Sequence, residues 1–430
     1  GSDTATLSGS ATTGTFASVN VGSAIAVSAN LSGLTLSNTN YYVAGVSSPL
    51  SANISAAPVT IGGLAAANKV YDTTTAASLT GTAVIAAGLL GSDTATLSGS
   101  ATTGTFASAN AAPGIVVTAN LANLQISNSN YYIAGIASPV TADITGKPVT
   151  ITASNQTGTY GTAIASLGST AFTSSGFLNS DGVSSVSLTY LGSNSVPGTV
   201  NAGTYSGGLL ASDAVAKAGT TLSNYSITYV AANLIINAAP LTVTADSQTM
   251  AYGSASFPTF TYVATGLKNG DAPFTGSLAT VASVFNGNAG SASNVGAYAI
   301  NQGTLSAGTN YSISFVSANL TVTPVALVIS ANSQSSTYGS ALNLGNSAFS
   351  ATGLVNGDTV SSTGLTVLGN TIVPGNTNAG IYTIVSNNAA GAHITNYVLT
   401  YQTGVLTINP KPINTKEINV NAPKNKGIDP

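Results

Sequence analysis

Short alternations of apolar and polar residues run along the whole chain. Residues 240–245 (PLTVTA), 311–316 (YSISFV) and 405–409 (VLTIN) place apolar side chains at every second position, with Thr, Ser or Asn between them. A period of two is typical of a strand with one buried face. Gly, Asn and Asp interrupt these stretches about every eight to twelve residues, which is the spacing of a β-sandwich. The pattern therefore predicts an all-β chain of short strands.

Two stretches of the chain occur twice, with an offset of 90 residues. Residues 1–18 return unchanged at 91–108, and residues 37–61 match residues 127–151. Self-similarity at a fixed long period indicates an array of similar domains.

A second kind of repeat follows the first. Its openings carry Tyr before Gly, and its closings carry Asn before Tyr, with the closings 86 residues apart. The opening tyrosines are Tyr160, Tyr252 and Tyr338, and the closing ones are Tyr225, Tyr311 and Tyr397.

The repeats divide the chain into modules. We predict a partial module at 1–57, complete modules at 58–147, 148–239, 240–323 and 324–410, and a charged tail at 411–430. About ninety residues suffice for one two-layer sandwich with its own core. Pro recurs between the strands at each boundary and makes a short, stiff connection. We therefore expect Ig-like β-sandwiches joined end to end in an elongated rod, with β-grasp-like modules as the alternative.

The openings and closings resemble known repeats. Residues 69–77 (KVYDTTTAA) resemble the YDG-type repeat of bacterial surface adhesins, which makes 1–57 and 58–147 YDG-like. The Tyr-Gly openings and Asn-Tyr closings resemble the companion MBG repeat of YGX type, and together the resemblances cover nearly all of 1–410. They imply a secreted adhesin of the filamentous-haemagglutinin-like, two-partner-secretion class, in which such repeats act as stalk modules.

One position departs from the YDG pattern, because Thr73 stands where the repeat has Gly. Thr would strain a turn that needs a positive φ. Either the turn differs in this chain, or Gly is not obligatory in it.

Charge and composition exclude several functions. Only 4% of the residues are charged, with eight Lys or Arg and a net charge of −3, so no basic surface is expected to bind nucleic acid. There is no Cys for disulfides or thiolate metal sites. Every apolar run is shorter than the ~18 residues of a membrane span. We expect a secreted protein at the bacterial cell surface or in the extracellular matrix, without a membrane span.

The chain also lacks the residues of an enzyme. It has a single His, and His393 aligns with Thr221 and Ala307 of the neighbouring modules, so the repeat does not require an imidazole there. One Asp recurs per module in a turn, which is too few carboxylates for calcium. We predict no catalytic site, no cofactor and no metal, and we expect each recurring Asp to accept backbone hydrogen bonds within its own turn.

The recurring positions are predicted to be structural. Tyrosines that follow Asn, Tyr41 among them, suit a packed ring with a satisfied hydroxyl, and sugar stacking on exposed rings is the rival hypothesis. The predicted structural positions are Tyr71, Asp72, Asp93, Tyr131, Tyr160, Asp181, Tyr225, Tyr252, Asp271, Tyr311, Tyr338, Asp358 and Tyr397.

The two ends of the sequence suggest an alternative to a plain stalk. Residues 411–415 (KPINT) resemble the opening strand of a further module, whereas 1–57 lacks the counterpart of 58–90. Either the array was cut without regard to module boundaries, or one molecule donates a strand to the next and builds a filament. The donor residues would be Lys411, Pro412, Ile413, Ile418 and Val420.

We expect a structural stalk at the cell surface or in biofilm matrix. The alternatives are a filament subunit that associates with itself and a carbohydrate- or ice-binding module. A cell-surface or matrix polysaccharide would be the partner of the carbohydrate-binding form.

Overall fold

The computed structural model describes residues 2–369, 373 and 375–413. These residues form strands β1 to β35 and two short 3₁₀ turns, η1 (Leu222–Asn224) and η2 (Ile394–Asn396), and no α-helix. The predicted all-β class is confirmed, and the β-grasp alternative, in which a sheet packs around a helix, is not supported.

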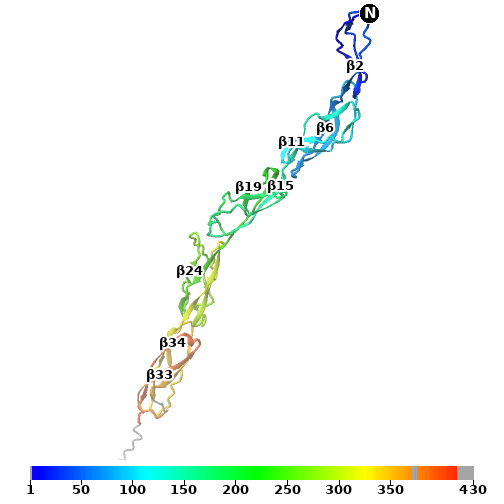
Figure 1. Cartoon of the computed structure of the whole chain (residues 1–430). Helices are drawn as coiled ribbons and strands as arrows, with labels where there is room; N and C mark the ends of the chain where they lie inside the picture. Colours follow the sequence, from blue (N-terminus) through cyan, green and yellow to red (C-terminus); the bar gives the residue numbers. More distant parts are fainter. Residues whose placement is uncertain (1, 370–372, 374, 414–430) are drawn as a thin grey trace, which may run out of the picture. The chain divides into compact units, whose positions relative to one another are not determined.

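The chain forms two compact units. Figure 1 colours the strands along the sequence, from blue at the N-terminus to red at the C-terminus. Unit 1 contains Gly1–Gln156, Ala165–Ser195 and Tyr205–Leu234, and unit 2 contains Thr157–Ile164, Val196–Thr204 and Ile235–Pro430.

Unit 1 begins with two small sheets. Strands β1 (Leu7–Gly9) and β4 (Leu34–Leu36) pair with each other, and β3 (Gly22–Ala29) lies between β2 (Gly14–Phe16) and β5 (Leu50–Ile54). None of residues 2–56 is buried. This part of unit 1 therefore has strands but no enclosed core.

The next part of unit 1 has a core. Its main sheet has seven strands in the order β13-β6-β8-β10-β11-β14-β7, and β9 pairs with β12 beside it. Val59 and Ile61 of β6 are buried together with Phe106, Val117 and Ile144. The bounds are β6 Ala57–Ala66, β7 Lys69–Val70, β8 Ala76–Ala87, β9 Leu97–Ser98, β10 Thr103–Phe106, β11 Ala112–Ala119, β12 Gln125–Ile126, β13 Tyr131–Ile136 and β14 Val140–Thr145.

The last part of unit 1 contains another three-stranded sheet. Strand β15 pairs antiparallel with β17 and parallel with β20, and β18 pairs antiparallel with β19. The bounds are β15 Lys147–Ala153, β17 Phe172–Ser175, β18 Val183–Tyr190 and β20 Tyr225–Val230. Three further strands have residues in both units: β16 Gln156–Thr159, β19 Gly203–Ala216 and β21 Ala232–Asn237.

Unit 2 contains the same two-sheet plan twice. The sheets are β24-β22-β27 and β23-β28-β26-β25 in the first module, and β31-β29-β34 and β30-β35-β33-β32 in the second. The bounds are β22 Ala239–Ala245, β23 Gln248–Ala251, β24 Tyr262–Thr265, β25 Ala279–Thr280, β26 Gly296–Asn301, β27 Tyr311–Val316, β28 Ala318–Thr323, β29 Val325–Ala331, β30 Gln334–Thr337, β31 Phe349–Thr352, β32 Val360–Val367, β33 Gly380–Gly391, β34 Tyr397–Gln402 and β35 Gly404–Asn409.

The two sheets of each module bury alternate residues. Leu241 and Val243 of β22 are fully enclosed, as are Leu320 and Val322 of β28. The intervening Thr242 and Thr244 are exposed. The alternation seen in 240–245 therefore marks a strand with one buried face, as predicted, and the modules are tandem β-sandwiches.

Candidate functional site: tyrosine–aspartate junctions

The recurring aspartates are the central residues of the candidate site. The N–H of Asp271 donates to the carbonyl of Lys268 at 2.9 Å, and that of Asp358 donates to Val355 at 3.0 Å. Each Asp thus lies in a turn, as the sequence predicts. The carboxylates, however, accept hydrogen bonds from outside that turn.

Asp271 is shared by two tyrosines of different modules. The hydroxyls of Tyr160 and Tyr311 both donate to its Oδ2 atom, each at 2.7 Å. The two rings meet edge to face, with centroids 5.5 Å apart at 81°. These hydroxyl donors, Tyr311 first, lower the pKa of Asp271, whereas burial raises the pKa of Tyr311.

Asp358 repeats the arrangement one module later. It accepts from Tyr252 at 2.9 Å and from Tyr397 at 2.8 Å, and the rings are 5.6 Å apart at 82°. Asn356 donates to the Tyr252 hydroxyl at 2.8 Å, and His393 Nδ1 lies 2.9 Å from Asp358 Oδ1. Burial raises the pKa of both tyrosines.

Unit 1 holds a related junction. The hydroxyl of Tyr225 donates to Asp181 at 2.5 Å, and the ring of Tyr71 meets that of Tyr225 edge to face at 5.5 Å. Burial first, and then the bond to Asp181, raises the pKa of Tyr225 to about 12. In the same way Tyr131 donates to Asp93 at 2.6 Å, and this bond raises the pKa of Tyr131.

Pairs of asparagines form the second half of each junction. The Asn that precedes each closing tyrosine donates through Nδ2 to the Oδ1 of an Asn in the module before it, at 2.9 to 3.0 Å. Its own Oδ1 accepts the backbone N–H of the residue after that partner, at 2.8 to 2.9 Å. The pairs are Asn20 with Asn130, Asn110 with Asn224, Asn201 with Asn310, and Asn294 with Asn396. We call the tyrosine–aspartate contact and the asparagine pair together the latch.

The glycines after Tyr160 and Tyr252 are required for two reasons. Gly161 and Gly253 have φ of +81° and +76°, which favours Gly. A Cβ would also lie 2.2 Å from the side chain of Lys268 at Gly161, and 2.6 Å from that of Val355 at Gly253. The Tyr-Gly pair therefore allows the next module to approach closely.

The opening of residues 69–77 keeps its turn without Gly. Thr73 has φ +69°, so Thr occupies the left-handed conformation that Gly usually takes. Asp72 accepts from Lys69 Nζ at 2.8 Å and from the N–H of Thr74 at 2.9 Å. The Lys69 bond is the main cause that lowers the pKa of Asp72 to about 2. In this chain, Thr73 therefore adopts the positive φ of the turn without Gly.

These groups are suited to holding modules together. The polar members are tyrosine hydroxyls, amides and one carboxylate per junction, all engaged with one another. In the part of the chain that the structure describes, no cluster of three His, Cys, Asp or Glu side chains could bind a metal ion. The described residues also form no helix long and apolar enough to cross a membrane.

The sequence analysis identified the tyrosines and aspartates of the latch but not that they are hydrogen-bonded to each other. Tyrosine and aspartate were assigned separate roles, and the earlier asparagine of each pair was missed. The sequence contains a signal for the tyrosine–aspartate contact, because the closing tyrosines follow their aspartates at similar spacings of 44, 40 and 39 residues.

Tyr338 and the proposed donor residues are not brought into a junction. Tyr338 is 40% exposed. Lys411, Pro412 and Ile413 are exposed and lie in no strand, and Ile418 and Val420 lie outside the described residues.

Comparison with known families places the latches within recognised domains. Residues 149–235, 241–321 and 327–407 each match the MBG domain (YGX type), which together is more than half of the chain. The chain belongs to the MBG (YGX-type) domain family. Residues 55–142 match the YDG domain. The tandem YDG and MBG domains give the chain the repeat architecture of an adhesin, and neither family is enzymatic.

Other comparisons add little beyond this assignment. No curated protein matches the sequence of this MBG-domain chain. Among solved structures, the eight N-terminal Ig domains of Down Syndrome Cell Adhesion Molecule isoform 1.30.30 are similar at 12% identity and a TM-score of 0.18, over 90% of this chain. The chain spans about half (52%) of that structure. The four N-terminal Ig domains of Dscam1 isoform 1.9 are similar at 11% identity and a TM-score of 0.18, over 81% of this chain and 98% of that one.

Proposed function

We propose that the chain is a stalk segment of a secreted bacterial adhesin, which holds a binding region away from the cell surface or within biofilm matrix. The adhesin-like repeat architecture fits an extracellular or surface protein. The stalk role requires that neighbouring modules keep a fixed orientation under load.

The latch is the observation that carries this proposal. A loose connection would let modules swing, whereas here β14 and β15 are separated only by Gly146, and β28 and β29 only by Pro324. At each such connection a latch adds side-chain hydrogen bonds between the modules. Because its members are neutral apart from the Asp, salt should affect it little.

Solution scattering of the purified chain tests the proposal. We expect a maximum dimension of roughly 150 to 200 Å, from the ~3.4 Å rise of each strand residue. Asp271→Ala should open one junction and broaden the distribution of distances. Asp213→Ala is the matched control, because Asp213 accepts a hydrogen bond from its neighbour Ser212. A compact globule, or equal behaviour of the two variants, would contradict the stalk.

Polysaccharide binding stays a prediction. Exposed rings such as Tyr42, which is 84% exposed, are where a sugar would stack. Saturable binding of a matrix glycan that Tyr42→Ala abolishes would support it.

A further inference from the structure

Four buried tyrosines form two close pairs in unit 2. Tyr160 faces Tyr311, and Tyr252 faces Tyr397, with ring centroids 5.5 and 5.6 Å apart. All four residues are nearly enclosed, at between 1% and 7% exposed. These rings contribute packing, but two phenols that are held side by side can also react with each other.

Each pair shares one proton acceptor. Both hydroxyls of the first pair donate to Oδ2 of Asp271, and both hydroxyls of the second pair donate to Oδ2 of Asp358. Two phenol oxygens that bond to one atom lie close together, and an ortho carbon is only two bonds from its oxygen. The junction therefore brings together the ring carbons through which two phenols couple when they are oxidised.

The shared carboxylate also makes oxidation easier. A tyrosine that loses an electron becomes a strong acid, so the loss is easiest where a base accepts the phenolic proton. Asp271 and Asp358 are hydrogen-bonded to such protons before any reaction begins. Burial does not prevent oxidation, because an electron can tunnel through the layer of protein over a ring. Burial does keep the resulting radical away from other chains, so its nearest reactant is the partner ring.

We propose that the two tyrosine pairs are sites of oxidative crosslinking, at which a one-electron oxidant, of the class that peroxide forms with a haem or a metal, joins the rings as dityrosine. Each tyrosine gives one electron to the oxidant and gives its phenolic proton, through the shared carboxylate, to water. The two radicals then form one bond between ortho carbons, and the hydrogens at those carbons move to the oxygens. Two electrons and two protons are lost, and one peroxide that takes up both becomes two waters.

The new bond fixes a junction between two MBG domains. Tyr160 belongs to the domain at 149–235, and Tyr311 belongs to the domain at 241–321. The latch becomes a covalent joint, which restricts the unfolded chain as a disulfide does. The crosslink depends on the junction geometry alone, so its failure would leave the stalk proposal standing.

The chain contains matched tyrosine pairs that lack part of this geometry. Tyr71 and Tyr225 meet at 5.5 Å, but in the described part of the chain only Tyr225 of the two donates to an aspartate, Asp181. Tyr190 and Tyr205 meet at 5.7 Å, and burial and Tyr205, rather than an aspartate, raise the pKa of Tyr190. The crosslink yield should therefore fall from the pairs of unit 2, through the first of these pairs, to the second.

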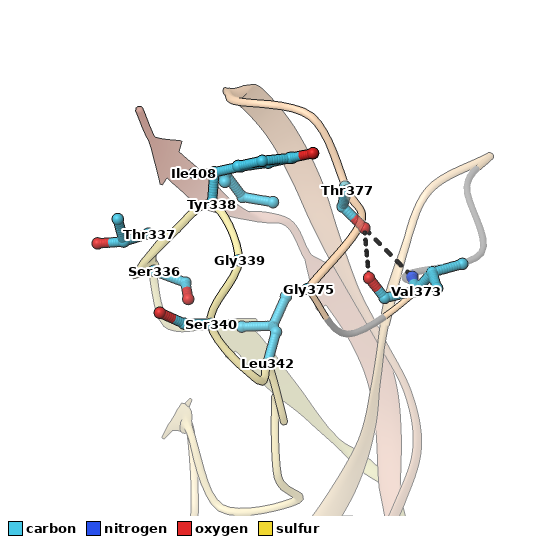
Figure 2. Close-up of a pocket in the computed structure, with 10 residues that line it drawn as sticks. All are labelled: Ser336, Thr337, Tyr338, Gly339, Ser340, Leu342, Val373, Gly375, Thr377 and Ile408. Atoms are coloured by element: carbon cyan, nitrogen blue, oxygen red, sulfur yellow. Dashed lines mark hydrogen bonds between the residues drawn. The ribbon is translucent and has the colours of Figure 1, made fainter. Parts of the chain in front are cut away.

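Tyr338 gives the reference for coupling between molecules. Figure 2 shows it beside a pocket whose other lining residues, Leu342 and Ile408 among them, include no second tyrosine. Tyr338 is 40% exposed. Its coupling to another chain should become weaker as the protein is diluted, whereas coupling within the buried pairs should not.

Photo-oxidation of the dilute full chain by a soluble ruthenium complex with persulfate tests the proposal. We expect dityrosine fluorescence from a chain that stays monomeric on a denaturing gel. Mass spectrometry of a peptic digest should find Tyr160 joined to Tyr311 and Tyr252 joined to Tyr397, with two hydrogen atoms lost per bond. The proposal fails if neither bond is found, or if Tyr190 is joined to another tyrosine in equal yield.

Two variants of one junction separate the effect of the base from that of proximity. Asp271→Asn removes the proton acceptor and should lower the yield of the Tyr160–Tyr311 bond about tenfold. The pair at Asp358 in the same chain should keep its yield, which also shows that the variant is folded. Asn310→Ala is the matched control, because it removes the asparagine pair of the same junction and leaves Asp271 in place. Equal losses in the two variants would overturn the role of the carboxylate.

Discussion

Residues 1–57 and 91–147 have similar sequences, identical over the first 18 residues, but different surroundings. Both form the same local pairs, with β2-β3-β5 in the first and β10-β11-β14 in the second. Phe16 is 39% exposed, whereas its duplicate Phe106 is 2% exposed. The difference comes from Ala57–Ala87, because β6, β7 and β8 pair with β13, β14 and β10 of the second copy only. Local sequence thus sets the hairpins, and further strands make them enclose a core.

Truncation of the duplicated Phe gives the largest expected contrast. We expect Phe106→Ala to lower the free energy of unfolding by about 3 to 5 kcal/mol, because it removes a buried ring and leaves a cavity. Phe16→Ala should cost less than about 1 kcal/mol, as at other exposed sites. Urea denaturation of the two variants measures the contrast. Equal costs would mean that residues 2–56 are covered in solution.

Much of the fold could be predicted from the sequence, because strand alternation and the 90-residue offset are properties of the letters themselves. The difference in burial between residues 1–57 and 91–147 could not be predicted, because Phe16 and Phe106 lie in identical stretches of sequence and yet differ in exposure. The role of Asp271 also could not be predicted from the local sequence pattern. Its turn is local, but its Tyr160 partner lies 111 residues away, and only the packing of two modules brings them together.

Removal of the hydroxyl from the duplicated tyrosine, Tyr131 or Tyr41, should give the second largest contrast in stability. Tyr131 donates to Asp93 at 2.6 Å and accepts the N–H of Leu90 at 3.0 Å. Tyr131→Phe leaves both groups unpaired and should cost about 1 to 2 kcal/mol. Tyr41→Phe should change stability by less than about 0.5 kcal/mol, because its site is exposed. If the urea midpoints of the two variants matched, the latch in the second copy would be energetically neutral.

High pH should weaken the covered part of unit 1. Tyr225 has its pKa raised to about 12, so the native state keeps a proton that an unfolded tyrosine loses near pH 10. The stabilisation is complete below pH 10 and is lost as the pH rises toward 12. Urea midpoints measured from pH 9 to 12 should therefore fall, and Tyr225→Phe should make the fall shallower. Tyr41→Phe is the control, and a slope unchanged in Tyr225→Phe would contradict this origin.

The smallest contrast concerns a single bulge in the duplicated strands. Ala24 has φ +52°, and its duplicate Gly114 has φ +64°. The N–H of Ala24 donates to Asn53 Oδ1 at 2.9 Å, and the N–H of Gly114 donates to Asp143 Oδ1 at 2.8 Å. No atom lies within 4 Å of a Cβ placed at Gly114, so backbone strain alone decides how Gly114→Ala changes the stability. Gly114→Ala should cost about 1 kcal/mol, and Ala24→Gly should gain somewhat less, because Gly also gives the unfolded chain more freedom. Thermal unfolding of the two variants checks the signs. Opposite signs of similar size would show that the two bulges are equivalent, whereas equal signs would contradict this equivalence.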